Sequence, residues 1–520
     1  MNIRLLLHTL SHLKFRQIFY QVLYRIHKAH YVALACPHAA ALECADFIEK
    51  YDCLDVTARR FTFINIPYCY TDWNETKNGM LWAYNLNYMD WLGQKGLSFD
   101  EGAKWIDLFI KDLPKNNIGL DPYPIALRSL NWIKFICQHQ TNISEGQLGA
   151  WNDSLYSQVK LLERKLEFHL LGNHLLEDLY ALYIASLYFH DEALYQKVAR
   201  LLMKELDEEV LADGMHYEQS PMYHCILLDR LLDCYNFSTH NVFFEQQEEV
   251  NAFLLSKAKK MLGHLSHLIY ADGSIPLLND SAFGIAPTAQ QLFAYAQRLD
   301  IAFEAVPFSE CGYRKFKNEC FEAIVDVGNI TSTYQPGHTH ADTFNFELRI
   351  DGQPFMVDTG ISTYNKTARR QYERSTAAHN TVTINDCDSS EVWGGFRVGK
   401  RAKVTLLADD NGGVEAQHTG FGSLGTHKRR FELKSDAFIV KDEVSGSALA
   451  KSMLHFSASE EILSSHSNQI ITTHGIIYLD GAEKVEIIDE KVSERYNEFI
   501  PIKKAIIHFR GKLNIRITKK

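Results

Sequence analysis

Two different spacings of hydrophobic residues divide the chain near residue 310. Upstream, the apolar positions of 155–170 follow the i, i+3, i+4 rule, which is typical of an amphipathic helix. Further helices are predicted over 175–199 and after Ser220-Pro221, because serine is a preferred N-cap and proline a preferred first-turn residue. Short connections between such helices favour antiparallel hairpins.

Downstream, the spacing changes to every second residue. Apolar residues alternate strictly over 344–350, Asp351-Gly352 is a hairpin turn signal, and 354–357 begins the return strand. A series of short strands separated by turn residues is typical of an all-β sandwich. The strands expected after this hairpin are Lys403–Leu407, Phe431–Leu433, Phe438–Val440, Ile470–Thr472, Ile476–Leu479, Val485–Ile488 and Ala505–Phe509.

The length of 520 residues exceeds that of one ordinary domain. We expect three parts: an N-terminal helical segment over 1–60, a helical domain over 61–308 and a β-sandwich over 309–520. In the first part, apolar residues from Leu6 to Val22 predict an amphipathic helix. Such a helix either packs on the protein, the more frequent outcome, or lies on a membrane surface. No run of about 18 apolar residues occurs, so no membrane span is expected.

Composition narrows the classes of ligand. The formal net charge of -10 argues against non-specific nucleic-acid binding, and any acidic ligand must be met by a local basic cleft. Ten cysteines are scattered without a CxxC pair, a usage that favours a reducing compartment. The N-terminus lacks a clean apolar core and a small-residue cleavage site. We therefore expect a cytoplasmic protein, with the periplasm as the alternative.

A histidine-rich stretch at 337–342, Gly-His-Thr-His-Ala-Asp, is the first candidate for chemistry. We expect it on a strand, where His338 and His340 point to the same face because side chains alternate. Asp358 and His379 follow downstream. Two imidazoles and one carboxylate can bind zinc and leave one position open. For a lone His-x-His pair, ordinary hydrogen-bonded histidines are the more common explanation.

Two further segments bring polar residues to helix starts. Asn173 and His174 follow a glycine, and Glu177 shares a helix face with His174. Tyr217 and Tyr223 flank the next helix start, where a phenol near cationic groups can shuttle a proton. Taken singly, a capping asparagine and packing tyrosines explain these residues equally well, since the chain holds 25 tyrosines.

Five short motifs carry a resemblance to a known family. They are N-H-L-L-E at 173–177, Y-E-Q-S-P-M-Y-H at 217–224, G-H-T-H-A-D at 337–342, V-D-T-G at 357–360 and R-S-T-A-A-H-N-T at 374–381. In this order they resemble the heparinase II/III-like polysaccharide lyases, which include heparin, heparan and alginate lyases. The resemblance implies an incomplete (α/α) toroid followed by an antiparallel β-sandwich. It also implies an acidic, uronate-containing polysaccharide as substrate.

The same resemblance implies β-elimination, in which the C5 proton of a uronate is removed, the C4–O bond breaks and an unsaturated sugar remains. Asn173 and His174 would neutralise the carboxylate as enolate charge develops. Tyr223 or His338 would be the base, and the sequence leaves this choice open. Tyr223 would also protonate the leaving oxygen, with Tyr217 as the alternative phenol.

The family's zinc ligands correspond to His340, Asp358 and His379. We expect a structural and positional Zn²⁺ ion and not a water activator. Two arginines lie inside or beside matched segments and would offset the charge of a polyanion. Expected substrate contacts are Glu177, Tyr217, Arg128 and Arg374.

Two other functions remain open. A glycoside hydrolase on a helical toroid needs two carboxylates, for which Glu177 and Glu218 are candidates, but it gives the His, Asn and Tyr set no role. A catalytically silent glycan-binding or polysaccharide-assembly protein needs none of the catalytic residue types that are present. Product absorbance separates the three, since only a lyase forms a conjugated unsaturated uronate.

Overall fold

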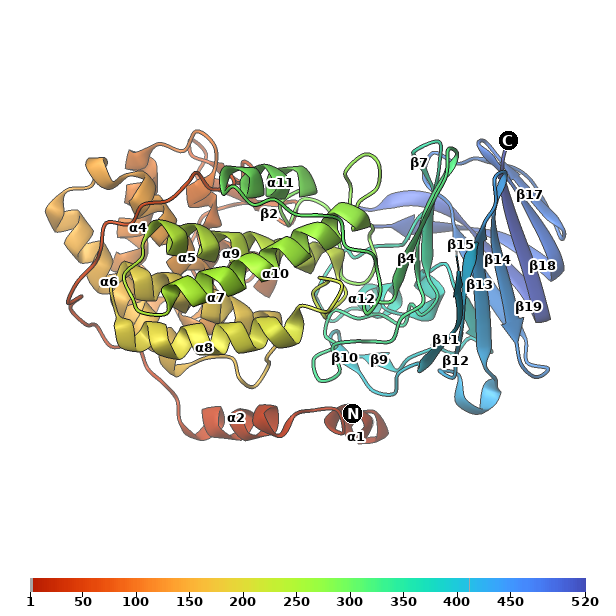
Figure 1. Cartoon of the computed structure of the whole chain (residues 1–520), viewed down its shortest axis with the longest axis horizontal. Helices are drawn as coiled ribbons and strands as arrows, with labels where there is room; N and C mark the ends of the chain where they lie inside the picture. Colours follow the sequence, from red (N-terminus) through yellow and green to blue (C-terminus); the bar gives the residue numbers. More distant parts are fainter. Residues whose placement is uncertain (1–2, 411) are drawn as a thin grey trace.

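A helical half and a strand-rich half lie side by side along the long axis of the molecule (Figure 1). The structure, a computed structural model, describes residues 3–410 and 412–520. The last long helix of the first half ends at Arg298, and the first strand of the second half begins at Tyr313. The predicted change of spacing near residue 310 therefore falls in the connection between the halves.

The first half is built from paired helices around one buried helix. Its helices are α3 (Met80–Tyr88), α4 (Phe99–Asp112), α5 (Pro122–Gln138), α6 (Glu145–Arg164), α7 (Asn173–Tyr188), α8 (Glu192–Glu209), α9 (Pro221–His240), α10 (Gln247–Leu268) and α11 (Ala289–Arg298). Helix α7 packs against α5, α8 and α9, and His174 is the one residue of α7 that is not buried. Burial on all sides explains why its sequence is apolar on several faces.

The second half consists of antiparallel sheets. Its elements are β4 (Tyr313–Lys317), β5 (Phe321–Asp326), β6 (Phe346–Ile350), β7 (Gln353–Met356), α12 (Ala368–Glu373), β8 (Val382–Ile384), β9 (Val392–Trp393), β10 (Arg397–Val398), β11 (Val404–Asp410), β12 (Gly413–His418), β13 (His427–Leu433), β14 (Ala437–Val444), β15 (Ala450–His455), β16 (Ile462–His466), β17 (Gln469–Thr472), β18 (Gly475–Val492) and β19 (Ile500–Lys519). A four-stranded sheet has the order β4-β5-β6-β7. A ten-stranded sheet has the main path β11-β12-β13-β14-β19-β18-β17-β16, with β15 and β8 beside it.

The two larger sheets share one apolar core, as a sandwich requires. Phe346 of the small sheet lies 5.8 Å, between ring centroids, from both Phe431 and Phe438 of the large sheet. The predicted hairpin between β6 and β7 is present, with Asp351 (φ 50°) and Gly352 (φ 77°) in the left-handed region that such a turn demands.

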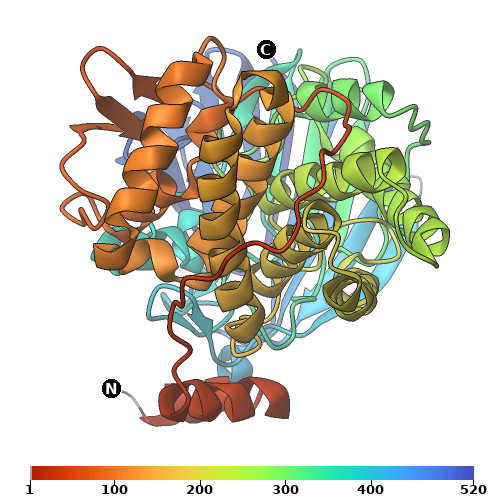
Figure 2. The same ribbon diagram turned by 90° about the vertical axis from the view of Figure 1, so that its left-hand side faces the viewer.

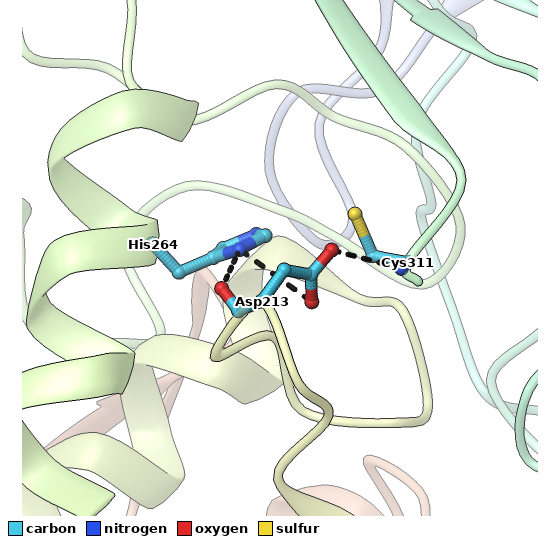
Figure 3. Close-up of side chains that lie close together, drawn as sticks. All are labelled: Asp213, His264 and Cys311. Carbon is cyan, nitrogen blue, oxygen red and sulfur yellow. Dashed lines mark hydrogen bonds and ion pairs between the residues drawn. The ribbon is translucent and has the colours of Figure 1, made fainter. Parts of the chain in front are cut away.

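Asp213 ties the connection between the halves to the helical side (Figure 3). Its Oδ2 accepts hydrogen bonds from the main-chain N–H groups of Ser309 and Cys311, both at 2.9 Å. Nδ1 of His264, on α10, lies 2.8 Å from the main-chain oxygen of Asp213. Asp213, His264 and Cys311 are all buried, so these bonds hold the start of the strand-rich half against the helices.

The first 60 residues differ from the predicted helical segment. Helices α1 (Ile3–Leu10) and α2 (Phe15–Ile26) are followed by irregular chain, and then by a small sheet of β1 (Leu54–Asp55), β2 (Arg60–Phe63) and β3 (Ile66–Cys69). The prediction was wrong beyond Ile26. There, main-chain N–H groups donate to side chains of the helical half and not to main-chain oxygens of a helix of their own. Leu34 N–H donates to Ser157 Oγ (2.8 Å) and Cys36 N–H to Asp153 Oδ1 (2.7 Å). None of the described helices is both long and apolar enough to span a bilayer.

Candidate active site

A cavity of about 370 Å³ lies between the two halves. The side chain of His338 reaches it from the strand-rich half. Three more of its lining residues, Asn173, His174 and Tyr223, come from α7 and α9 of the helical half. All four residues predicted to act in catalysis therefore line one cavity, and Glu177 lines it as well.

The position of Asn173 follows from a sharp backbone turn. Gly172 precedes α7 with φ 61° and ψ −149°, a conformation open to glycine. The turn brings Asn173 against Glu218, whose carboxylate accepts from Asn173 Nδ2 through both oxygens (3.0 and 2.9 Å) and from its main-chain N–H (3.1 Å). A Cβ at position 172 would lie 2.6 Å from Glu218 Oε1, so only glycine leaves this contact intact.

His174 is the cationic candidate at the cavity wall. Its Nδ1 lies 3.0 Å from Glu167 Oε2, and its ring stands edge-on to Tyr123. Partial burial by itself would lower the pKa of His174, but the charge of Glu167 and its hydrogen bond outweigh that effect and raise the pKa above its usual value. A protonated imidazole suits the carboxylate of an acidic sugar.

Glu177 is the acidic counterpart, fully buried one turn further along α7. Burial raises the pKa of Glu177 to about 7, although Arg230 opposes this shift with its Nε at 3.4 Å from Oε2. Arg230 also lines the cavity. This wall therefore carries a carboxyl group that titrates near neutral pH beside a permanent cation.

Tyr223 and His338 face each other across the junction of the halves. Ser220 caps α9 by accepting from Tyr223 N–H (3.2 Å), as the Ser-Pro pair predicts. The Tyr223 and His338 rings stack with centroids 3.9 Å apart, and the hydroxyls of Tyr223 and Tyr364 lie 3.3 Å apart. Burial raises the pKa of Tyr223 above its usual value, so its phenol is protonated at neutral pH.

Asp280 organises the histidine-rich stretch. That stretch is an irregular loop and not the predicted strand, yet both imidazoles turn toward one carboxylate. His338 Nδ1 lies 2.9 Å from Oδ2 and His340 Nε2 2.8 Å from Oδ1 of Asp280, which Arg370 also contacts with both terminal nitrogens. Because an ionised carboxylate only accepts, this bond puts the proton of neutral His338 on Nδ1. Its Nε2 keeps a lone pair, 3.6 Å from Glu218 Oε2.

The predicted zinc ligands come together in part. His340 is oriented by Asp280 and His379 by Asp358 (Nδ1 to Oδ2, 2.7 Å), and the two imidazole centroids lie 5.2 Å apart. The remaining nitrogens, His340 Nδ1 and His379 Nε2, are buried and have no hydrogen-bond partner in the described part of the chain. Imidazoles held by carboxylates, each with one bare nitrogen, are the arrangement that zinc sites use.

The ligand atoms of His340, Asp358 and His379 do not all lie within 4.8 Å of one another. Among the described residues, the group that reaches this spacing is Asp213, His264 and Cys311. Hydrogen bonds already occupy the Asp213 carboxylate there (Figure 3). The donor chemistry thus fits zinc at the histidine site, and the predicted ligand set stays a prediction.

Comparison with known sequences supplies the family. Residues 129–299 match the model described as Heparinase II/III N-terminus, and residues 301–518 match the one described as Heparinase II/III-like, C-terminal. The chain belongs to the heparinase II/III-like family. The predicted resemblance is thereby confirmed.

Curated relatives of this heparinase II/III-like chain share about a quarter of their residues with it over the aligned part. A heparin-sulfate lyase of Pedobacter heparinus is 24% identical over 337 residues, which cover 57% of this chain and 49% of the relative. A heparin-sulfate lyase of Bacteroides thetaiotaomicron is 23% identical over 323 residues, which cover 52% and 44%. The chain therefore spans about half the length of the curated relatives it matches.

Solved structures confirm the predicted fold class, an incomplete (α/α) toroid followed by an antiparallel β-sandwich. A crystal structure of heparinase III aligns with a TM-score of 0.69 at 13% identity, covering 97% of this chain and 91% of that chain. A heparan sulfate lyase from Pedobacter heparinus aligns with a TM-score of 0.56 at 16% identity, covering 97% and 87%. At these identities the similarity concerns the fold alone.

Three residues predicted as substrate contacts in this heparinase II/III-like chain do not line the cavity. Arg128 is fully buried and donates to Gln158 Oε1, to the main-chain oxygen of Asn87 (2.9 Å) and to that of Gly119 (2.7 Å). All its nitrogens bond within the helical half, so it has none left for a ligand. Arg128 therefore belongs to the matched segment because it holds the helical half together.

The structure contradicts the same prediction for Arg374 and Tyr217. Arg374 is fully buried and donates to the main-chain oxygen of Thr339 (2.8 Å), so it braces the loop between His338 and His340. Tyr217 is buried near the Gly172 turn, where its ring packs on that of Tyr334 with centroids 5.8 Å apart. Both support the cavity wall from behind.

Basic residues, most of which the sequence analysis did not single out, line a second cavity of about 740 Å³. It shares Tyr84, Tyr123 and His174 with the first, so the two cavities are neighbours. Its cationic or titratable basic residues are His27, Lys28, His30, Arg164, Lys165, His169 and His174, against the acidic Asp121 and Glu167. The absence of any Asp or Glu before Glu43 was the available sequence signal for the N-terminal part of this wall.

Proposed function

We propose that this chain is a polysaccharide lyase that cleaves a uronic-acid-containing glycan by β-elimination in the cavity between its halves. The observation that carries the proposal is the convergence of Asn173, His174, Tyr223 and His338 on that one cavity. They come from three separate segments of the chain, two in the helical half and one in the strand-rich half. Neither a glycoside hydrolase nor a silent binding protein would need these four side chains in one cavity.

In the proposed reaction, His338 is the base and Tyr223 the acid. Asp280 keeps the proton of neutral His338 on Nδ1, so Nε2 is free to take the C5 proton. Tyr223 is protonated because burial raises its pKa, and its phenol gives a proton to the leaving oxygen. Because the rings of His338 and Tyr223 stack on each other, proton removal and proton donation would take place on the same side of the sugar.

The uronate carboxylate needs a positive partner as enolate charge develops. His174 supplies it, because its raised pKa favours the imidazolium form. The amide nitrogen of Asn173 donates to both carboxylate oxygens of Glu218. Substrate binding therefore exchanges the Glu218 contact of Asn173 for one to the sugar carboxylate, and Glu177 stays available for a sugar hydroxyl.

The second cavity supports a substrate longer than one sugar. It adjoins the first at His174 and carries Lys28, Arg164 and Lys165 on its walls, none of which lies within 4.0 Å of a described carboxylate. An acidic sugar next to the cleaved bond would find complementary charge there. Residues from both α6 and the N-terminal segment then contribute to glycan binding.

We further propose that zinc is bound at the histidine site. His340 Nδ1 and His379 Nε2 would be ligands, with Asp358 as the third ligand or as the carboxylate that orients His379. When bound, the ion would tie together three segments of the strand-rich half. Its role is positional, because the loop that it anchors also carries His338.

The proposed activity is tested on the full chain with heparan sulfate, alginate, hyaluronate and bacterial capsular glycans. A lyase raises ultraviolet absorbance as unsaturated uronate forms. New reducing ends without that absorbance would instead identify a hydrolase. Binding to a glycan column without either product would identify a binding protein, and both outcomes overturn the proposal.

A further inference from the structure

Helices α1 and α2 expose an unusual amount of apolar surface. Of the 21 large hydrophobic side chains that are exposed in the described part of the chain, eight lie on these two short helices. They are Ile3, Leu7, Leu10, Phe15, Ile18, Phe19, Val22 and Ile26. Phe15 is 81% exposed and Ile26 69%, so the stripe is open along its whole length.

The spacing gathers these side chains on one face of each helix. Those of α1 recur at i, i+4 and i+7, and those of α2 at i, i+3, i+4, i+7 and i+11. A surface helix that only packs on its own protein turns such a stripe inward. Here the stripe points to solvent.

The protein instead holds α2 by its polar and aromatic face. Gln17 Nε2 donates to the main-chain oxygen of Leu170 (3.0 Å), and the Tyr24 hydroxyl donates to that of Leu166 (2.5 Å). The Tyr20 ring packs on Phe168 with centroids 4.7 Å apart. Of the apolar face predicted from the sequence, Leu10, Ile18 and Val22 are exposed, whereas Leu6 and Leu13 are half-buried.

Charge indicates what covers the exposed stripe. No Asp or Glu occurs before Glu43, although the chain as a whole carries a net charge of -10. The same stretch holds five cationic side chains, Arg4, Lys14, Arg16, Arg25 and Lys28. Lys14 and Arg16 pair with Glu208 and Glu205 of α8, so the exposed Arg25 is the cation that the test below changes. An apolar helix face in a basic stretch without carboxylates matches an anionic lipid surface, which takes apolar side chains below its headgroups and attracts cations to its phosphates.

The location of the helices suits a planar partner. Figures 1 and 2, which differ by a quarter turn, both show α1 and α2 as a layer below the rest of the molecule. We propose that α1 and α2 dock this protein on an anionic membrane surface, with the eight exposed side chains inserted at the headgroup boundary. This inference is independent of the lyase proposal.

Vesicle co-sedimentation of the full chain tests the inference. We expect binding to phosphatidylcholine vesicles in which about a third of the lipid is phosphatidylglycerol, and much weaker binding to phosphatidylcholine alone. The double variant Phe15→Ser/Phe19→Ser should lower the partition coefficient about tenfold or more without changing the melting temperature. The matched control Leu407→Ser/Leu463→Ser, at two equally exposed leucines on strands, should bind like the parent.

A second variant keeps the inference testable if the first misfolds. Arg25→Glu reverses an exposed charge and should weaken binding to the anionic vesicles at low salt, with the difference shrinking as salt rises. Absence of parent binding to anionic vesicles overturns the proposal. If the parent does not bind vesicles but forms a concentration-dependent dimer, and Phe15→Ser/Phe19→Ser abolishes that dimer, the surface binds a second copy of the chain.

Discussion

One buried carboxylate governs the chemistry of several neighbours at the centre of the site. Burial by itself would raise the pKa of Asp280, but Arg370 and the two imidazoles hold it well below its usual range. Asp280 therefore stays ionised and orients both histidines. Because a buried charge that loses its partner is costly, the loop that carries His338 has one favoured arrangement.

The first prediction concerns Tyr223→Phe. This change keeps the ring that stacks on His338 and removes the proposed proton donor. On a glycan that the parent cleaves, turnover should fall by about 10² or more, the usual scale for a general acid, with an unchanged melting temperature. Steady-state kinetics followed by ultraviolet absorbance measures the loss.

Tyr217→Phe is the matched control. Tyr217 belongs to the same motif, but its side chain is buried and does not line the cavity. This variant should keep nearly full activity. If both phenylalanine variants turn over glycan like the parent, a phenol takes no part in the reaction.

The second prediction concerns His340→Ala and the proposed zinc ion. The parent should contain close to one zinc per chain by elemental analysis, and a chelator should lower its melting temperature. The variant should have lost the metal, so the chelator should no longer change its melting temperature. His466→Ala, at an exposed histidine, should behave like the parent in both measurements.

Measuring the zinc content separates a role of His340 in metal binding from a role in holding the fold through Asp280. His340→Ala also removes the contact with Asp280, so lower stability alone proves nothing about metal. A parent without zinc after purification in its presence, and insensitive to chelator, would show that the bare nitrogens of His340 and His379 serve another purpose.

At the scale of elements, the start of α7 couples backbone geometry to the site. Gly172 turns the chain so that Asn173 begins the helix under Glu218 while His174 faces the cavity. Side chains of α2 hold the loop before Gly172 by hydrogen bonds to the main-chain oxygens of Leu166 and Leu170. The positions of the proposed catalytic side chains therefore depend on contacts made outside the cavity that they line.

The third prediction concerns Gly172→Ala. The added Cβ would lie 2.6 Å from Glu218 Oε1 and 3.0 Å from the Tyr217 hydroxyl, in a backbone conformation that L-residues rarely adopt. We expect a loss of about 1–3 kcal/mol of unfolding free energy together with most of the activity. Urea unfolding and the absorbance assay measure the two effects.

Gly149→Ala supplies the comparison. Gly149 lies inside α6, and a Cβ there meets nothing within 4 Å. This variant should gain about 0.4–1 kcal/mol and keep its activity. A Gly172→Ala protein as stable and active as Gly149→Ala would mean that the turn relaxes without moving Glu218.

Periodicity and motif order predicted the helices and strands well, but they did not predict which residues contact one another. The switch of spacing and the Ser220-Pro221 helix start were recognisable because both depend on neighbours in sequence. The role of Asp280 was not, because its bonds reach His338 and Arg370, 58 and 90 residues away. Arg128 was misjudged for the converse reason, since a motif also contains residues that hold the fold together and never meet a ligand.

At the scale of the whole molecule, the proposed active site requires that the two halves keep their relative position, because residues of both halves line the cavity. Asp213 helps to hold them, because its carboxylate accepts from Ser309 and Cys311 at the start of the strand-rich half. Burial by itself would raise the pKa of Asp213, but hydrogen bonds from the Cys311 side chain and from the two main-chain N–H groups outweigh it and lower the pKa. Burial also lowers the pKa of His264 to about 4.

The fourth prediction combines these shifts with Asp213→Asn. A depressed folded-state pKa means that the Asp213 carboxylate stabilises the protein above its unfolded pKa of about 3.9, and that this contribution is lost as pH falls through the folded value. At pH 7 the asparagine variant should lose about 1–3 kcal/mol, because its amide nitrogen replaces one acceptor oxygen. The gap between parent and variant should narrow below about pH 4.

Urea unfolding at several pH values separates the two titrations of the junction. Between about pH 6.5 and 4, both proteins should lose stability, since neutral buried His264 resists protonation that the unfolded chain accepts. Only the parent should lose the Asp213 contribution at still lower pH. Asp386→Asn, at an exposed carboxylate paired with Lys451, should stay within about 0.5 kcal/mol of the parent throughout. An Asp213→Asn protein as stable as this control at pH 7 would mean that other contacts hold the halves together.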